Sequence, residues 1–468
     1  MPYRDETLVC VEIGSYETRA IFGLAESLTP PKLRLKTQVG KRLDSEEYLC
    51  GEGLQAALDS EPQPSIEVIR PIVHGHIQDW SALTAFFTHV LQVLGTGLAG
   101  TQVSEHPVIL VVPPQWSNQD REKVTQLFLR NFLRPAFMIV DMPFASLYAC
   151  NAVTGTVIDV GYEDTNVTTI IDSVVNPSGH RSISLGGKSM TLHLLEMLQK
   201  HPPLEQNSQV ALEANTIGFD LAEAIKCSSI CEILPDTLGS NTMAFQTGEP
   251  AKEEEEGVLD IAAVVASGKT REYLARIQAG KDGNGSVQEE VPNAQLTHNN
   301  VKIKDQTLVI GNDRFKVADV LLEDGPLLDA IHDAIANATI EPIRRRELWE
   351  NIVVVGGGAR IKGFREKLIL NLQLRFASKL TQASADPYAP ALYNAYPVTI
   401  RSIKIPIHFP EWNGKSEDEV KKGINEEATF LGGCIIAHIA FSSSETSGSA
   451  RLYSTMADYS EAGPVVDV

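Results

Sequence analysis

The chain has 468 residues, of which 43% are hydrophobic and 21% charged, a composition typical of globular proteins. Because a single core rarely grows beyond about 250–300 residues, we expect two lobes. The 60 acidic and 40 basic side chains give a formal net charge of −20. This charge argues against direct binding to DNA or to an anionic membrane, since both depend on Lys and Arg. It suits a basic partner, although an acidic balance also serves solubility alone.

The first residues, the short apolar stretches and the cysteines favour an intracellular, soluble protein. The first seven residues include charged side chains and no apolar signal core, so secretion is not expected. The longest apolar stretches, Val108–Val112 and 430–441, are too short to span a bilayer. The six scattered cysteines form no disulfide framework in so long a chain. Cys227 and Cys231 lie one helical turn apart, but no further Cys or His is near in the sequence to complete a metal site.

One short pattern occurs twice, at 11–18 and again at 158–165: apolar, acidic, apolar, Gly, two variable residues, acidic, Thr. In both copies a strand ends in a carboxylate, Glu12 or Asp159, and a glycine turn leads into a second strand. The repeat suggests two β-hairpins of a duplicated α/β lobe, and a coincidence of short patterns is the alternative.

Two buried strands are each followed by a helix. Val108–Val112 is stopped by two prolines, after which Ser117 caps a helix whose apolar residues recur at helical spacing. The second strand, 351–355, runs into three glycines and then a helix. Strands that alternate with helices in this way are typical of an α/β fold. The polar region at about 239–300, with its acidic run at 253–256 and a helical piece at 261–277, is interpreted as an insertion, and the Ser-rich stretch 442–449 as a loop.

Two acidic hairpin turns that face one another provide the groups for a metal–phosphate ligand. The N–H groups of glycine turns donate to phosphate oxygens, and carboxylates hold Mg²⁺ with its waters. The glycine run after 351–355 allows the close approach of a phosphate or an adenosine. A turn from strand to helix also needs glycine for packing alone, so a nucleotide site and simple packing are both open interpretations.

The sequence resembles actin and the actin-related proteins over most of its length. The matching segments follow one another in the same order as in actin: 105–110, 121–126, 146–149, 311–315, 343–351, 356–357, 431–437 and 459–464. The resemblance implies an α/β, actin-like fold, with two duplicated ribonuclease-H-like lobes around a central nucleotide cleft. It assigns 1–144 plus 370–468 to the first lobe and 145–369 to the second, which carries the insertion at about 239–300.

The departures from actin fall on the nucleotide site that the resemblance implies. The site would be formed by Glu12, Gly14, Ser15, Arg19, Asp159, Gly161, Lys226, Gly356, Gly357 and Gly358. Glu12 replaces an aspartate and Arg19 a lysine. Tyr16 replaces a small glycine, Tyr162 an aspartate and Glu163 a glycine. Phenols and an additional carboxylate are unfavourable near phosphate, by size and by charge. We therefore expect a degenerate site that needs no cofactor and holds ATP with Mg²⁺, if at all, as a structural ligand.

Actin orients its attacking water with a glutamine and a histidine, and the matching residues are Met142 and Asn166. A Met side chain does not hydrogen-bond strongly to water, and hydrolysis depends on that positioning. We therefore expect no catalytic residues, no metal bound by the protein and no ATPase activity. The alternatives are an ATP-binding actin-fold protein with residual ATPase activity, or a cytoskeletal protein of filament ends. The short acidic segment 41–48 and the insertion argue against a filament.

The segment 408–412 and the acidic run before 260–277 resemble the ninth class of actin-related proteins, the subunits of fungal SWI/SNF- and RSC-type chromatin remodellers. This resemblance implies a nuclear, non-catalytic subunit that pairs with a second actin-related protein, of the seventh class. It further implies binding to the helicase/SANT-associated helix of a Snf2-type ATPase and to a small accessory regulator. Neither sequence-specific DNA binding nor membrane binding is expected.

An amphipathic partner helix needs an apolar groove. We expect Tyr148, Cys150, Ile436 and Ile439 to line it. The alternative is that Ile436 and Ile439 are core residues of a C-terminal helix. His74 is interpreted as a packing or surface residue rather than a ligand.

Overall fold

The computed structural model describes residues 3–24, 28–45, 47–60, 65–95, 106–205, 211–213, 216–234, 293–303, 306–323, 325–383, 399–409, 411–412, 427–442 and 452–463. The chain divides into a large unit, Met1–Ile233 with Asn300–Val468, and a small unit, Leu234–Asn299. The small unit is described only at Leu234 and 293–299, where it forms the short 3₁₀-helix Asn293–Gln295. The predicted acidic run at 253–256, the helix at 261–277 and nearly all of 442–449 lie outside the described residues.

The first sheet of the large unit has six strands, in the order β18-β10-β9-β1-β2-β3. Their bounds are β1 (Val9–Ile13), β2 (Glu17–Phe22), β3 (Leu33–Lys36), β9 (Val108–Val112), β10 (Ala136–Asp141) and β18 (Ser454–Thr455). β1 lies antiparallel to β2 and parallel to β9. Every residue of β1 and β9 is buried, as expected for strands covered on both faces.

The second sheet has the order β13-β12-β11-β17, with β11 (Gly155–Val160), β12 (Thr165–Ile171), β13 (Val174–Ile183) and β17 (Ile352–Val355). β11 lies antiparallel to β12 and parallel to β17, which is the arrangement of β1 with β2 and β9. Glu12 pairs with Arg19 in the first hairpin, and Asp159 pairs with Asn166 in the second. Both predicted hairpins therefore form, and their carboxylates occupy matching positions.

The described helices of the large unit are α1 (Gly51–Leu58), α2 (Trp80–Val93), α3 (Asn118–Gln126), α4 (Met142–Ala149), α5 (Gly187–Lys200), α6 (Phe219–Lys226), α10 (Asp319–Leu322), α11 (Pro326–Ala338), α12 (Pro342–Glu350), α13 (Phe364–Ala383), α16 (Ala428–Ser442) and α17 (Met456–Ala462). Shorter strands form three small sheets from β4 (Val39–Arg42), β5 (Tyr48–Leu49), β6 (Ile66–Ile69), β7 (Ile72–Val73), β8 (His76–Ile77), β14 (Leu204–Glu205), β15 (Asn299–Ile303) and β16 (Gln306–Ile310). The predicted cap of α3 is confirmed, because Ser117 Oγ accepts the Asp120 N–H and the Asp120 carboxylate accepts the Ser117 N–H.

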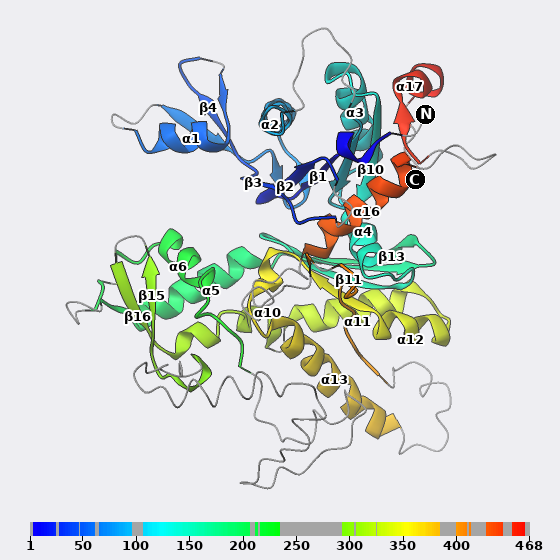
Figure 1. Cartoon of the computed structure of the whole chain (residues 1–468). Coiled ribbons are helices and arrows are strands. Elements are labelled where there is room, and N and C mark those ends of the chain that lie inside the picture. The colour runs from blue at the N-terminus through cyan, green and yellow to red at the C-terminus, as the bar shows by residue number, and fades with distance from the viewer. Residues whose placement is uncertain are drawn as a thin grey trace, which may run out of the picture. The chain divides into compact units, whose positions relative to one another are not determined.

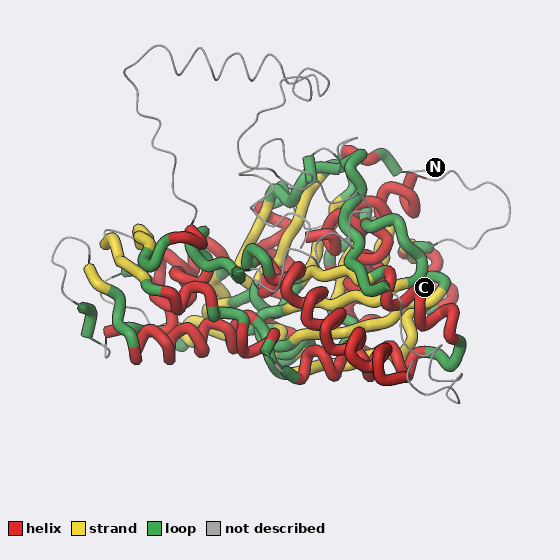
Figure 2. Tube along the Cα trace, turned by 90° about the horizontal axis from the view of Figure 1, so that it is seen from below, coloured by secondary structure: helices red, strands yellow, loops and turns green. Residues whose placement is uncertain are grey.

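Helices cover the second sheet on both faces. α11 and α12 pack on one face, where Figures 1 and 2 show them running beside the strands, and α4 packs on the other. α4 and α16 also contact strands of the first sheet. Strands enclosed by helices in this way confirm the predicted α/β class. Within the described residues, no helix has the length and apolar content that crossing a membrane requires.

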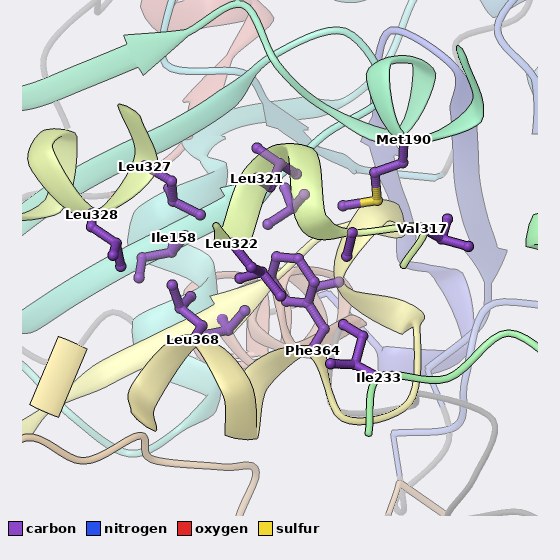
Figure 3. Packing of buried hydrophobic residues seen from close by; sticks show 14 of the residues in the cluster. Ile158, Met190, Ile233, Val317, Leu321, Leu322, Leu327, Leu328, Phe364 and Leu368 are labelled. Carbon is purple, nitrogen blue, oxygen red and sulfur yellow. The ribbon is translucent and has the colours of Figure 1, made fainter. Parts of the chain in front are cut away.

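Among the described residues, the hydrophobic core forms three clusters. One joins the second sheet to α5, α10, α11 and α13, and Figure 3 shows the ring of Phe364 packed beside Leu322 and Ile233. Another includes residues of both sheets together with α4 and α16. Here α16 approaches so closely that a Cβ on Gly432 would lie 1.8 Å from the carbonyl oxygen of Ala145. The third fills the opposite face of the first sheet.

Candidate functional site

The first hairpin contains a buried ion pair. Arg19 Nη1 lies 2.8 Å from Glu12 Oε1, and the two side chains are 8% and 10% exposed. Arg19 also donates from Nε to Glu17 Oε2 at 3.0 Å. In the described part of the chain, Glu12 Oε2 is buried without a hydrogen-bond partner. Burial raises the pKa of Glu12 and the charge of Arg19 opposes this rise, while Glu427 and Asp159 add to it.

Asp159 is the next-to-last residue of β11, close to the predicted glycine turn. Burial raises the pKa of Asp159 to about 6, and the charge of Arg19 acts against the rise. Gly356 has a φ of +98°, and a Cβ there would lie 2.4 Å from Asp159 Oδ1. A Cβ on Gly358 would lie 2.5 Å from Val160 Cγ1, whereas Gly357 faces open space. Close packing on β11 therefore explains Gly356 and Gly358 without a ligand.

The turns of the two hairpins meet through aromatic rings. Tyr16 and Tyr162 are stacked, with ring centroids 4.3 Å apart and an interplanar angle of 24°. The guanidinium of Arg70 lies over both rings, 5.7 Å from the Tyr16 centroid and 4.9 Å from that of Tyr162. The turn glycines use their N–H groups locally, because Gly14 donates to the Glu17 carbonyl and Gly161 to the Asp164 carbonyl.

Polar contacts join the same turns around His74. The His74 N–H donates to Glu163 Oε2 at 2.8 Å, and His74 Nδ1 lies 2.7 Å from Asp164 Oδ2. Ser15 Oγ accepts the N–H of Gly75 at 3.2 Å. His74, expected from the sequence to be a packing or surface residue, therefore forms with Gly75 a bridge between the two turns, a role that the sequence did not indicate. Its partners lie 89 and 90 residues away, and no local pattern reports such a pairing.

Lys226 occupies the end of α6 and binds protein atoms. Its Nζ lies 2.9 Å from the Gly187 carbonyl oxygen, 2.8 Å from Thr191 Oγ1 and 2.8 Å from Glu223 Oε2. An ammonium group has three protons to donate, so these contacts match its capacity. Lys226 therefore fastens α6 to the beginning of α5.

Asn166 and Met142, which the resemblance matches to the water-positioning residues of actin, lie in different surroundings. Asn166 Oδ1 accepts a hydrogen bond from Gln115 Nε2 at 2.7 Å. Met142 is the first residue of α4 and is buried in the core shared by the two sheets. The contact from Gln115 was not predicted from the sequence, because Gln115 stands in an unpatterned loop after β9.

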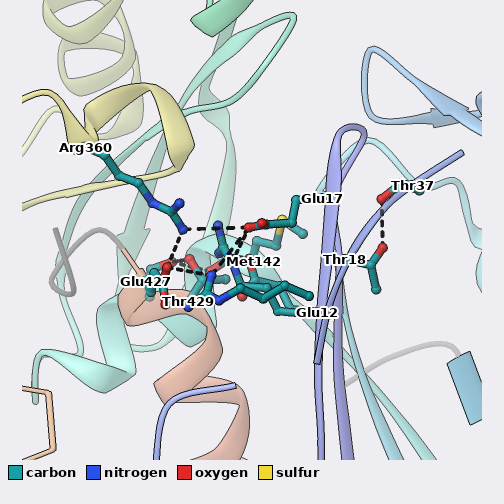
Figure 4. Close-up of polar contacts among 11 residues, drawn as sticks. Glu12, Glu17, Thr18, Thr37, Met142, Arg360, Glu427 and Thr429 are labelled. Atoms are coloured by element: carbon teal, nitrogen blue, oxygen red, sulfur yellow. Dashed lines mark hydrogen bonds and ion pairs between the residues drawn. The ribbon is translucent and has the colours of Figure 1, made fainter. Parts of the chain in front are cut away.

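Glu17 connects the first hairpin to a charge cluster at the beginning of α16, because its Oε2 lies 3.5 Å from Arg34 Nη1 and 3.7 Å from Arg360 Nη2 (Figure 4). The carboxylate of Glu427 accepts two hydrogen bonds from Arg34, at 2.8 and 2.7 Å, and a third from Arg360. Burial acts to raise the pKa of Glu427, but the hydrogen bonds and charges of the surrounding arginines prevail and lower it. Arg34 belongs to β3, and Arg360 ends the 3₁₀-helix that follows β17. Glu427 therefore links elements of both sheets.

The four residues predicted for a partner groove lie on α4 and α16 or directly beside them. Cys150 and Ile436 are buried in the core shared by the two sheets, and Tyr148 is half-buried against it. Ile439 is 41% exposed. Helix binding at these residues stays a prediction. In the described ranges no group of three His, Cys, Asp or Glu side chains is arranged to hold a metal ion.

Comparison with known proteins gives a consistent result. Residues 4–391 match the actin family. The chain is 32% identical to "SWI/SNF and RSC complexes subunit arp9" of Schizosaccharomyces pombe, over 99% of this chain and 98% of that protein. It is 22% identical to "Actin-related protein 7" of Oryza sativa, over 98% of both chains. An "Actin-like protein" of Neurospora crassa is 25% identical over 67% of this chain and 69% of that protein.

Proposed function

The chain belongs to the actin family, with the α/β actin-like fold expected from its sequence, and from this premise we propose that it is a non-catalytic subunit of a nuclear chromatin-remodelling complex. A relative that matches almost the full length of the chain is named as a subunit of the SWI/SNF and RSC complexes, which supports both the complex and the nuclear location. In this proposal the chain pairs with a second actin-related protein, of the seventh class. It also binds the helicase/SANT-associated helix of the Snf2-type ATPase and a small accessory regulator.

The observation that carries the non-catalytic role is the stack of Tyr16 on Tyr162, with ring centroids 4.3 Å apart. The family resemblance locates the phosphates of a nucleotide between the two hairpin turns. Two rings at this separation are in van der Waals contact, which leaves no room between them for a phosphate group. Glu163 adds a carboxylate that is 8% exposed at the same place, where its charge would repel phosphate oxygens.

The surroundings of the remaining site residues support the same proposal. Arg19 and Lys226, the two cations that would bind phosphate or nucleotide, are both engaged with protein oxygens. Asn166 is held by Gln115, and Met142 has no group that orients a water. The residues therefore do not fit ATP with Mg²⁺ as a reactive ligand, and we derive no chemical step through them.

The proposed contact with the ATPase helix involves α4 and α16. Ile439 is exposed and Tyr148 partly so, while Ile436 and Cys150 belong to the buried core of the same two helices. An amphipathic helix binds such a surface through its apolar face. The net charge of −20 favours a basic helix, mainly through the rate of association and its dependence on salt.

Titration calorimetry with the purified chain, its seventh-class partner and a peptide of the helicase/SANT-associated helix tests this assignment. We expect Ile439→Asp to weaken helix binding by about tenfold or more, as for a central apolar contact. Ile343→Asp is the matched control, because Ile343 is an exposed isoleucine of α12, 75% exposed. Equal effects of the two variants would overturn the proposed surface. ATP turnover by the wild-type chain at an actin-like rate would overturn the non-catalytic role.

A further inference from the structure

We propose that the two hairpin turns are fastened together by a latch of protein side chains that takes over the bridging role of a nucleotide. The latch consists of Tyr16, Arg70, His74, Tyr162, Glu163 and Asp164. The inference deepens the proposed function and rests on its premise that no nucleotide lies between the turns. It adds that the connection between the hairpins of the two sheets is permanent and independent of ligand.

The aromatic part of the latch comes from three separate places in the chain. Tyr16 lies in the turn before β2, and Tyr162 lies in the turn after β11. Arg70 follows β6 and sits over both rings. An Arg within about 6 Å of an aromatic ring is attracted by the ring electrons, so Arg70 interacts with both members of the stack. The rings from the two hairpins therefore hold each other without a ligand.

The polar part of the latch supplies partners for two neighbouring carboxylates. Glu163 and Asp164 are only 8% and 10% exposed, and buried carboxylates need partners of their own. Glu163 accepts the His74 N–H at 2.8 Å and lies 3.7 Å from Arg70 Nη1. Asp164 pairs with the His74 ring. Both acids of the second hairpin thus depend on the segment between β6 and β8.

The backbone of this segment is shaped for these contacts. His74 has a φ of +51°, a left-handed conformation that is uncommon for residues other than glycine. Gly75 follows with a φ of +73°, and its N–H donates to Ser15 of the first hairpin. The strained turn presents one N–H group to each hairpin, which is the arrangement that a bridge between them requires.

In a nucleotide-dependent protein the ligand joins the two hairpins, so their relation changes when the ligand leaves or reacts. Here the groups in that place are covalently part of the chain. The two sheets consequently keep one relative arrangement, and the surface that the subunit offers to its partners does not change conformation with ATP.

Hydrogen exchange of the full-length chain, followed by mass spectrometry of peptides covering the two hairpins, tests the latch. Tyr162→Ala removes the stack. We expect it to speed hydrogen exchange by about tenfold in both hairpins, because the interaction of the two rings and their burial no longer stabilise the closed turns. Tyr162→Phe keeps the ring and is expected to behave as the wild type. Arg130→Ala is the matched control for Arg70→Ala, because Arg130 lies over the Tyr459 ring at 4.9 Å, away from the hairpins.

The outcomes separate the latch from the proposed function. If Tyr162→Ala and Arg70→Ala leave exchange in the first hairpin unchanged, there is no latch, whatever the chain binds. If ATP with Mg²⁺ slows exchange in both hairpins of the wild type, the bridge is a nucleotide and the latch is wrong. Where Tyr162→Ala does not fold, the milder Arg70→Gln is measured in the same way. Binding of the seventh-class partner, measured in parallel, tests the proposed function separately, because its failure leaves the exchange result intact.

Discussion

Arg19 donates from Nη1 to Glu12 Oε1 across the first hairpin at 2.8 Å, and the same guanidinium acts on Asp159 of the second. Its charge opposes the rise in pKa that burial causes at each of these carboxyl groups. Burial of an ion costs several kcal/mol unless a partner is near. Arg19 therefore stabilises two acids that belong to different sheets, in the place where the family resemblance expects a phosphate-binding cation.

Removal of Arg19 leaves Glu12 buried without its cation. We expect Arg19→Met to lower the free energy of unfolding by about 3–5 kcal/mol, the usual cost of breaking a buried ion pair from one side. The double variant Arg19→Met with Glu12→Gln removes the uncompensated acid and is expected to recover part of this loss. Urea denaturation at pH 7 measures both. A double variant no more stable than the single one would contradict the pairing.

The raised pKa of Asp159 gives a stability that depends on pH. Because its folded pKa of about 6 lies above the unfolded value, the folded state binds more protons between about pH 4 and 6, and stability falls as the pH rises through this window. Asp159→Asn removes this contribution. As the pH rises from 4 to 7, we expect the free energy of unfolding of the variant to increase relative to that of the wild type by about 2 kcal/mol, since one pKa unit corresponds to about 1.4 kcal/mol. Stability curves that run parallel across this range would rule out the assignment.

Glu427 is expected to behave in the opposite sense, because its pKa is lowered by the surrounding arginines. The contribution of ionised Glu427 to the free energy of unfolding is present above the ordinary carboxyl pKa. It is lost as the pH falls through the pKa of Glu427 in the folded state. Glu427→Gln therefore costs about 1–3 kcal/mol at pH 7, given charged hydrogen bonds to partly exposed arginines, and the cost shrinks in acid. Glu350→Gln is the control, because its partners Arg346 and Arg401 are 60% and 63% exposed and solvent weakens such surface pairs. Urea denaturation at several pH values measures both, and equal losses would count against the Glu427 cluster.

The sequence was sufficient for features that depend on neighbouring residues. The alternating patterns at 11–18 and 158–165 predicted both hairpins, and Ser117 predicted the beginning of α3. These structures arise from local hydrogen bonding and side-chain size, which short stretches of sequence encode.

The contacts between these elements could not be predicted in this way. Arg34 and Glu427 are 393 residues apart, and His74 is 90 residues from Asp164. Such pairs depend on the path of the whole chain, and their residue types are common on ordinary surfaces. Tyr16 and Tyr162 were recognised as obstacles to phosphate, yet nothing in the sequence indicated that they would stack on each other. Helical spacing left two alternatives open for Ile436, a partner groove or the core, and could not decide between them.

Nucleotide provides the last test, because a ligand that binds the folded state alone stabilises it by mass action. ATP at about one hundred times its dissociation constant would add about 2.7 kcal/mol to the free energy of unfolding. With Tyr16 and Tyr162 in contact, we expect millimolar ATP with Mg²⁺ to leave the melting temperature of the wild-type chain unchanged, and EDTA to have no effect. Differential scanning calorimetry measures both, with actin as the positive control. A rise of several degrees with ATP would show that the tyrosine stack opens to admit the nucleotide.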